Sequence, residues 1–206
     1  VIWFNRSGQN KMKQTSGHRE NGGYDFYFHK GITWSYSTMA PFSVRIMPTG
    51  FVFDVNGSSL FLPEQYYNYV LCFLQSCVGR FIIDSIKSAF SIQAGTIRNL
   101  PVIGNTTPKI EALANECVTL SQQDWDSYET SWDFKGHPLV LGRLPEPVWG
   151  DVPDKVAFQN TSLSYTYQIY WKKTCEYRFE KLKANEEELN RIFIDIYGLQ
   201  DELTPE

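Results

Sequence analysis

Short runs of alternating apolar and polar residues dominate the first part of the chain. Residues 24–29 and 42–46 alternate in this way, and residues 50–55 continue the pattern after a Pro-Thr-Gly turn. An alternation with a period of two predicts strands with one buried face. Asn56-Gly57 is a strong hairpin signal, because these residues readily adopt the left-handed backbone of a tight turn. The chain up to about residue 62 is therefore predicted to be β-rich.

Helical spacing replaces this alternation further along the chain. Pro63 suits the start of a helix, because the amide that proline lacks would be unpaired there. Residues 92–103 return to a short extended pattern, and residues 110–123 are helical again. A tryptophan- and proline-rich insert at residues 124–160 predicts an ordered loop draped over a surface. The apolar positions that predict the first helix are Val70, Leu74, Cys77, Phe81, Ile82 and Ile86.

Residues 163–197 form a long stretch without proline or glycine, which predicts helix. A seam of apolar residues recurs there every seven positions, flanked by Phe179 and Phe193. We expect the seam and both phenylalanines to be buried against other elements of this chain or against a partner. Asn185 and Glu188 could form a capping box at a break, so the pattern allows one helix or two. Gly198 suits the position just past a helix end. The seam consists of Cys175, Leu182, Leu189 and Ile196.

The order of these elements predicts an α+β fold. We expect a β-rich domain with a packed helix over residues 1–108. A mainly helical region over residues 109–206 follows, with the insert inside it and a long helix at its end. The 206 residues suffice for one sizeable core, or for a domain with an appended helical piece. The chain opens with Val1-Ile2-Trp3 and no initiator methionine, so we expect a fragment whose missing neighbour lies upstream.

Charge divides the chain more clearly than its net value of -4 suggests. Residues 1–110 contain ten Lys and Arg against five Asp and Glu, whereas the remainder contains nine against eighteen. A basic front half attracts phosphates, while an acidic back half suits water or another protein, although chance asymmetry explains the split equally well. The polar residues 7–23 are predicted to be a mobile loop, either merely solvated or closing over an anionic partner.

The four cysteines include no C-x-x-C pair, and reduced buried thiols fit a cytoplasmic protein. Residues 66–86 are the only membrane-like segment, but Gln75, Arg80 and Asp84 interrupt it, so we expect a buried amphipathic helix and not a span.

Catalytic motifs are missing from the sequence. It has neither the glycine-rich turn that binds S-adenosylmethionine nor the Asn/Asp-Pro-Pro-aromatic motif of amino-group methylation. No Asp/Glu-x-Lys follows Pro153-Asp154 as in metal-dependent nucleases, and no phosphate-binding Gly-Lys-Ser/Thr loop is present. The three histidines lie far apart, which argues against a metal site. We expect no catalytic or metal-binding residues, and no cofactor binding by this chain alone.

Recognition chemistry is what remains. Arg and Asn can make bidentate contacts with guanine and adenine edges, while Ser, Thr and Lys mostly hold phosphates. Trp34 fits a core position somewhat better than a stacking platform. Arg45 lies between apolar Val44 and Ile46 and so points to the opposite face, where it is as readily a solvated side chain as a base reader. The candidate DNA-binding residues in or beside predicted turns are Lys30, Thr33, Trp34, Ser35, Arg45, Asn56 and Ser58.

Several stretches resemble known families. Residues 28–61, the helix with Phe73-Leu74-Gln75-Ser76, and residues 97–102 together resemble the recognition domains of type IIG restriction–modification enzymes and of specificity subunits. In those domains a loop–strand block precedes a leucine-asparagine-serine helix and a leucine-proline-isoleucine exit, and Gln75 stands here in place of the asparagine. Residues 124–134, with His137-Pro138-Leu139, and residues 185–199 resemble the PglX-type adenine methyltransferases of BREX phage-exclusion systems.

The resemblance implies a double-stranded DNA recognition module of an S-adenosylmethionine-dependent adenine methyltransferase in a phage-defence system. Catalysis and the cofactor would then belong to the missing upstream methyltransferase domain, and other defence-system subunits are further expected partners. A protein-interaction module that docks a partner subunit through the seam and the insert is the alternative. A complete enzyme of another type is disfavoured by the missing motifs.

Overall fold

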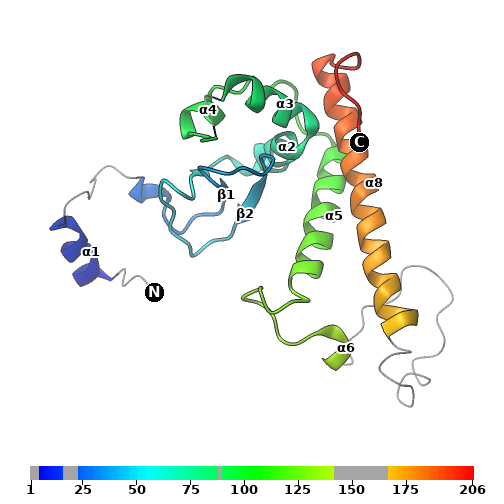
Figure 1. The fold of residues 1–206 in the computed structure, drawn as a ribbon. Coiled ribbons are helices and arrows are strands. Elements are labelled where there is room, and N and C mark those ends of the chain that lie inside the picture. Colours follow the sequence, from blue (N-terminus) through cyan, green and yellow to red (C-terminus); the bar gives the residue numbers. More distant parts are fainter. Residues whose placement is uncertain (1–4, 16–22, 88–89, 142–166) are drawn as a thin grey trace.

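The computed structural model describes residues 5–15, 23–87, 90–141 and 167–206, and it confirms the predicted α+β class (Figure 1). A small three-stranded antiparallel sheet is followed by helices, the last of which is long. The elements are α1 (Arg6–Lys13), η1 (Tyr24–Phe26), β1 (Gly31–Trp34), β2 (Val44–Met47), β3 (Ser59–Leu60), α2 (Glu64–Gln75), α3 (Cys77–Ile86), α4 (Ala94–Arg98), α5 (Pro108–Trp125), α6 (Pro138–Leu141), the π-helix η3 (Tyr167–Trp171) and α8 (Lys172–Tyr197).

The sheet has the strand order β2-β1-β3, so that β1 is central and paired on both sides. Ile32 lies opposite Ile46 and Leu60, and Trp34 lies opposite Val44. These apolar residues share one face, which packs into the core. The other face carries the polar residues of the same strands and is described below as part of the candidate interface.

A sharp bend at Ser76 separates α2 from α3. The Ser76 hydroxyl donates to the carbonyl oxygen of Phe73 at 2.7 Å and accepts the amide of Gly79 at 3.1 Å, which caps the start of α3. A Cβ atom at Gly79 would lie only 2.1 Å from the Phe73 carbonyl oxygen, so the close turn requires glycine. Among the described residues no single helix is long and apolar enough to cross a membrane. Taken together, α2 and α3 have the length and composition of a membrane-spanning segment, but the pair is bent by 72° at the break between them.

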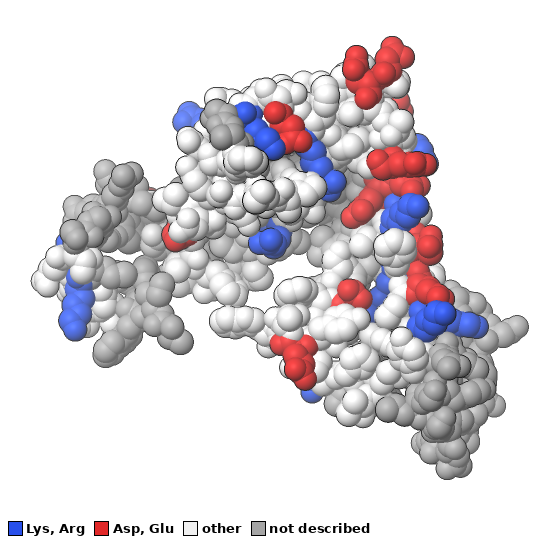
Figure 2. Space-filling model, viewed as in Figure 1, with Lys and Arg blue, Asp and Glu red and all other residues white. Residues whose placement is uncertain are grey.

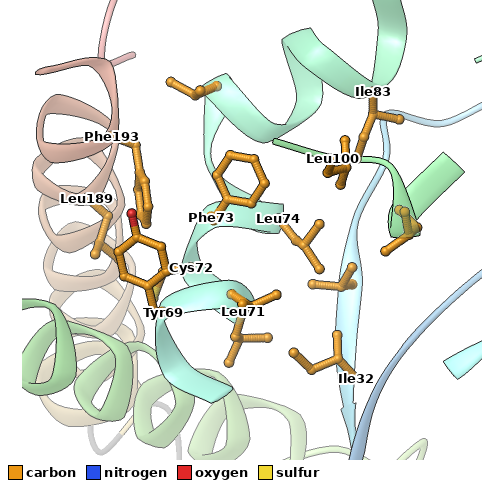
Figure 3. Packing of buried hydrophobic residues seen from close by; sticks show 14 of the residues in the cluster. Ile32, Tyr69, Leu71, Cys72, Phe73, Leu74, Ile83, Leu100, Leu189 and Phe193 are labelled. Carbon is orange, nitrogen blue, oxygen red and sulfur yellow. The ribbon is translucent and has the colours of Figure 1, made fainter. Parts of the chain in front are cut away.

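One hydrophobic core joins the sheet, α2, α3 and the C-terminal helix (Figure 3). Leu189 and Phe193 point from α8 toward Tyr69 and Phe73 of α2. The ring centroid of Phe193 lies 5.3 Å from that of Tyr69 and 5.9 Å from that of Phe73. Burial of each such side chain contributes roughly 1.5–3 kcal/mol. The core thus spans the predicted boundary at residue 108, and the division into two domains stays a prediction.

The long C-terminal helix confirms part of the predicted burial of the apolar seam. From Lys172 to Tyr197 α8 is continuous, and Gly198 ends it at φ 66°, as expected. Leu189 is buried and Leu182 and Ile196 are half-buried, whereas Phe179 is 64% exposed and is not buried by this chain itself. α8 packs alongside α5 and also meets α3 (Figure 1), so the buried stripe is set by more than one partner and not by one coiled-coil seam.

Tertiary context overrides the local pattern at the possible helix break. The Asn185 amide donates to a Glu116 carboxylate oxygen of α5 at 2.7 Å. Asn185 therefore holds α8 against α5 and does not cap a second helix.

Several other predicted elements differ in the structure. Residues 24–29 form η1 and a turn. Residues 50–55 form no strand, although the backbone of Phe28 exchanges two hydrogen bonds with residues 50 and 51. Residues 94–98, predicted as extended, form α4, in which only Ile97 is buried. Part of the predicted loop at residues 7–23 is helix α1, and residues 16–22 lie outside the described residues.

The tryptophan- and proline-rich insert is described only in its first part. Residues 126–141 form a series of turns and then α6, in place of one continuous loop. Residues 142–160 lie outside the described residues, so the prediction of a draped loop is not tested there.

The cysteines are free thiols, as predicted. Cys72 is buried, but Cys77, Cys117 and Cys175 are only half-buried. Burial raises the pKa of the Cys72 thiol to about 12 and that of Cys117 to about 11, so both remain protonated at neutral pH.

Candidate nucleic-acid interface

The solvent-facing side of the sheet brings two of the predicted residues together. Thr33 of β1 lies opposite Arg45 of β2 and opposite Ser59 of β3, so these three share the face away from the core. Arg45 is exposed, as expected from its apolar neighbours. The Thr33 hydroxyl donates to the Ser58 carbonyl oxygen at 3.0 Å, and the Ser59 hydroxyl lies 3.6 Å from the Met47 sulfur. Arg45 is thus a cation on a face that also carries the short polar side chains of Thr33 and Ser59 and the buried Met47.

A turn built on Asp54 borders this face. One Asp54 carboxylate oxygen accepts the amides of Asn56 and Gly57, both at 2.9 Å, which is an Asx-turn. The Ser58 hydroxyl donates to the Val55 carbonyl oxygen at 3.0 Å. These bonds fix the backbone while the Asn56 side chain stays exposed. The Asn-Gly pair therefore forms a tight turn, as predicted, but it leads into β3 and does not join two strands of a hairpin.

Lys30 lies at the other end of β1. Its ammonium group is 3.2 Å from a Glu64 carboxylate oxygen and 4.0 Å from the centre of the Tyr67 ring. The Tyr67 hydroxyl donates to the Gly31 carbonyl oxygen at 2.9 Å, and burial together with the Glu64 charge raises the pKa of Tyr67 to about 12. Three residues of strand separate Lys30 from Thr33, which corresponds to roughly 10 Å. Lys30 is therefore separated along the strand from Thr33, the residue that lies opposite Arg45.

Trp34 is a core residue and not a DNA contact. Its side chain is 2% exposed, and its indole nitrogen donates to the Ile92 carbonyl oxygen at 2.9 Å. The core position that the sequence favoured for Trp34 is therefore correct, and the predicted DNA contact is wrong. The strand register places Trp34 on the buried face with Val44. Ser35 follows directly and is half-buried.

Gln75 has a role that the sequence did not reveal. Its side-chain oxygen accepts the backbone amide of Val44 at 3.0 Å, which ties the end of α2 to β2 next to Arg45. The contact is not visible in the sequence because Gln75 and Val44 are 31 positions apart. Gln75 therefore helps to fix the strand that carries the exposed arginine.

The segment after α4 is clamped by two tyrosines. The Tyr197 hydroxyl donates to the Pro101 carbonyl oxygen at 2.7 Å and accepts the Ile103 amide at 3.1 Å. The Tyr69 hydroxyl donates to the Ile103 carbonyl oxygen. Leu100 is buried in the core, so this Leu-Pro-Val exit attaches the β-region to α8.

Charges are distributed unevenly over the surface. On the face drawn in Figure 2, most acidic side chains lie over α8 and the turn after α5, while isolated Lys and Arg lie over α1 and over the sheet and its covering helices. Helix α1 carries Arg6, Lys11 and Lys13, which are exposed, and has no acidic residue. Figure 1 shows α1 apart from the rest of the molecule. The basic residues in the first half of the sequence thus lie mostly on the surface.

Beyond the sheet, a buried arginine organises the turn after α5. Arg178 of α8 is 8% exposed, donates to the Gln123 carbonyl oxygen at 3.3 Å and lies 3.5 Å from the Ser127 hydroxyl. Its guanidinium stands 5.6 Å from the centre of the Trp171 ring, and the His137 ring packs edge-on against the same tryptophan. Sequence reasoning missed this cluster, since its members are far apart along the chain. Its hydrogen bonds and ring contact hold α8 against the turn after α5.

The described part of the chain holds no group of three or more His, Cys, Asp and Glu residues placed to bind a metal ion. The exposed polar surface of the sheet and the turn at residues 54–58 is the candidate interface. It presents hydroxyl, amide and guanidinium groups to solvent.

Comparison with known proteins shows that the chain is similar to part of two longer ones. No family model matches it. The chain is 36% identical over 197 residues to the adenine-specific methyltransferase PglX of Lacticaseibacillus casei (strain Zhang), across 95% of its own length and 15% of that protein. It is 30% identical over 187 residues to the adenine-specific methyltransferase BrxX of Escherichia coli O9:H4 (strain HS), across 87% of its own length and 14% of that protein. The chain therefore spans about one seventh of these curated relatives.

Proposed function

Because the chain corresponds to a part of a PglX-type adenine-specific methyltransferase, we propose that it is the double-stranded DNA recognition module of such an enzyme. The rest of the enzyme then supplies S-adenosylmethionine binding and methyl transfer, and the whole acts in the cytoplasm as part of a phage-defence system of the BREX or restriction–modification kind. The observation that carries the proposal is the exposed Arg45 on the sheet face away from the core, together with the fixed turn that carries Asn56 on the other side of β1.

The chemistry of this face suits a duplex. Arginine forms bidentate bonds with guanine and asparagine with adenine in the major groove, and hydroxyl groups contact phosphates. The strand pairing and the Asp54 turn hold the backbone beneath these side chains, so binding does not have to order it. A salt titration tests the class of function. The affinity of the chain for duplex DNA should fall steeply as salt rises, whereas a module that binds only protein should show no DNA affinity at all.

Arg45→Ala should weaken binding to the target sequence by about 1–3 kcal/mol and to random DNA by less, because a base contact is lost. Fluorescence anisotropy with both duplexes measures this for the chain, and methylation of the native site measures it for the whole enzyme. Arg98→Ala is the matched control, since Arg98 is exposed on α4, away from the sheet face. An equal loss on both duplexes would assign Arg45 to a phosphate, and no loss on either would show that this face is not the interface.

Lys30→Ala should weaken binding to all sequences about equally and lower the salt slope by roughly one. Glu64 competes with phosphate for the Lys30 ammonium group, so Glu64→Gln should strengthen binding slightly. The paired variants separate a charge effect from a change in the fold, because Glu64 is 83% exposed and its substitution leaves the packing of Lys30 on Tyr67 in place. A weaker affinity for Glu64→Gln would contradict the phosphate role of Lys30.

A docking role toward other defence-system subunits is a second candidate function. It is favoured by large aromatic side chains exposed outside the sheet face, above all Trp132. The two functions use different surfaces and are compatible in one chain.

A further inference from the structure

The turn after α5 carries a tryptophan whose side chain is exposed to solvent. Trp132 is 93% exposed, and its ring meets the ring of Phe51 edge-on, with the centroids 6.3 Å apart. Trp125, at the end of α5, is also exposed. Side chains this exposed add little to the stability of the fold. Exposed aromatic patches with a polar rim are typical of surfaces that bind other macromolecules.

The turn that presents Trp132 is fixed by its own side chains. The Ser131 hydroxyl is buried, donates to an Asp126 carboxylate oxygen at 2.6 Å and accepts the Asp133 amide at 3.1 Å. These bonds lie on both sides of Trp132 and hold its backbone in place. A preorganised aromatic side chain loses little conformational entropy on binding, which favours affinity.

The charge around this tryptophan is negative on balance. Asp124, Glu129 and Asp133 are exposed against one exposed cation, Lys135, and none of the three acids forms an ion pair within the part of the chain that the structure describes. Such carboxylates repel phosphates and attract cations. An aromatic face beside them suits a guanidinium group, which binds by cation–π attraction and by charge at once.

We propose that Trp132, Trp125 and Phe51, together with these acidic side chains, form a docking surface for an arginine-bearing segment of a protein partner. An arginine of the partner stacks on the Trp132 ring, and Glu129 and Asp133 neutralise its charge. The surface is distinct from the sheet face with Arg45, so the DNA-binding proposal stands or falls independently of it.

Peptide titration tests the docking surface. The probes are a short synthetic peptide of alternating Arg and Gly and its twin with Glu in place of every Arg. The chain should bind the first and not the second, and Trp132→Ala should weaken that binding by about tenfold or more. Glu129→Gln combined with Asp133→Asn should weaken it too and reduce its salt dependence. Phe81→Ala, at an exposed aromatic residue of α3, is the control and should bind normally.

Three results would overturn the proposal. One is equal affinity for the two peptides, and another is an unchanged affinity of Trp132→Ala for the arginine peptide. The third is a loss of duplex binding in Trp132→Ala, which would assign the tryptophan to DNA. The exposure of Trp132 predicts an unchanged melting temperature for this variant, so misfolding does not confuse the outcome.

Discussion

Gly79→Ala should destabilise the chain by about 2–4 kcal/mol, although alanine is normally the better helix former. Gly79 lies in the first turn of α3, where an added Cβ would meet the Phe73 carbonyl oxygen at 2.1 Å and the Phe73 carbonyl carbon at 3.1 Å. Both atoms belong to the backbone of α2, so no side-chain rotation relieves the clash. The bend at Ser76 must open, and Phe73 and Leu74, which lie on it, lose their packing.

Thermal unfolding followed by circular dichroism measures this effect, and the melting temperature should fall by about 10 °C. Gly95→Ala is the matched control, because Gly95 is also helical and a Cβ there would meet nothing within 4 Å. That variant should be neutral or slightly more stable, by less than about 1 kcal/mol. If the two variants melt alike, the close approach at Ser76 does not exist in solution.

The bend also shows how far the sequence predicts this fold. Helical periodicity over residues 64–86 was correct, but its interruption at Ser76 was not foreseen, because Ser76 and Gly79 act only through contacts with Phe73. The α+β class followed from patterns of period two and 3.6, which depend on burial alone. The alternating pattern failed for residues 24–29 and 50–55, where only Phe28 and residues 50–51 exchange backbone hydrogen bonds, because strand pairing depends on long-range partners that the pattern does not contain.

The candidate interface was predictable to a similar extent. Arg45 between two apolar neighbours had to point away from the core, and the register confirms that it does. Trp34 alternates with Ile32 and so shares its buried face, which a strict reading of the strand would have shown. Gln75 and Arg178 could not be placed, since their partners are distant along the chain and neither lies in a recognisable pattern. Sequence patterns thus predict which face a residue occupies, while long-range polar contacts require the structure.

Leu189→Asp should have the largest effect on the C-terminal half, with a loss of more than about 4 kcal/mol. Leu189 is 6% exposed in α8 and faces Tyr69 and Cys72 of α2 (Figure 3). An aspartate there would bury a carboxylate among apolar groups, which costs several kcal/mol beyond the lost packing. We expect α8 to detach from α2 and α5, or the whole chain to unfold.

Hydrogen exchange across α8 and α5, together with thermal unfolding, separates these two outcomes. Leu189→Ala removes the packing without adding charge and should cost about 2–5 kcal/mol at any pH. Burial raises the pKa of the new carboxyl above that of the unfolded chain, so Leu189→Asp should be least unstable at low pH and lose stability as the pH rises. Phe179→Asp, at an exposed position of the same helix, should change stability by less than about 0.5 kcal/mol. A Leu189→Asp variant that melts like Phe179→Asp would show that α8 does not pack on α2, and the core that joins the sheet to the C-terminal helix would have to be abandoned.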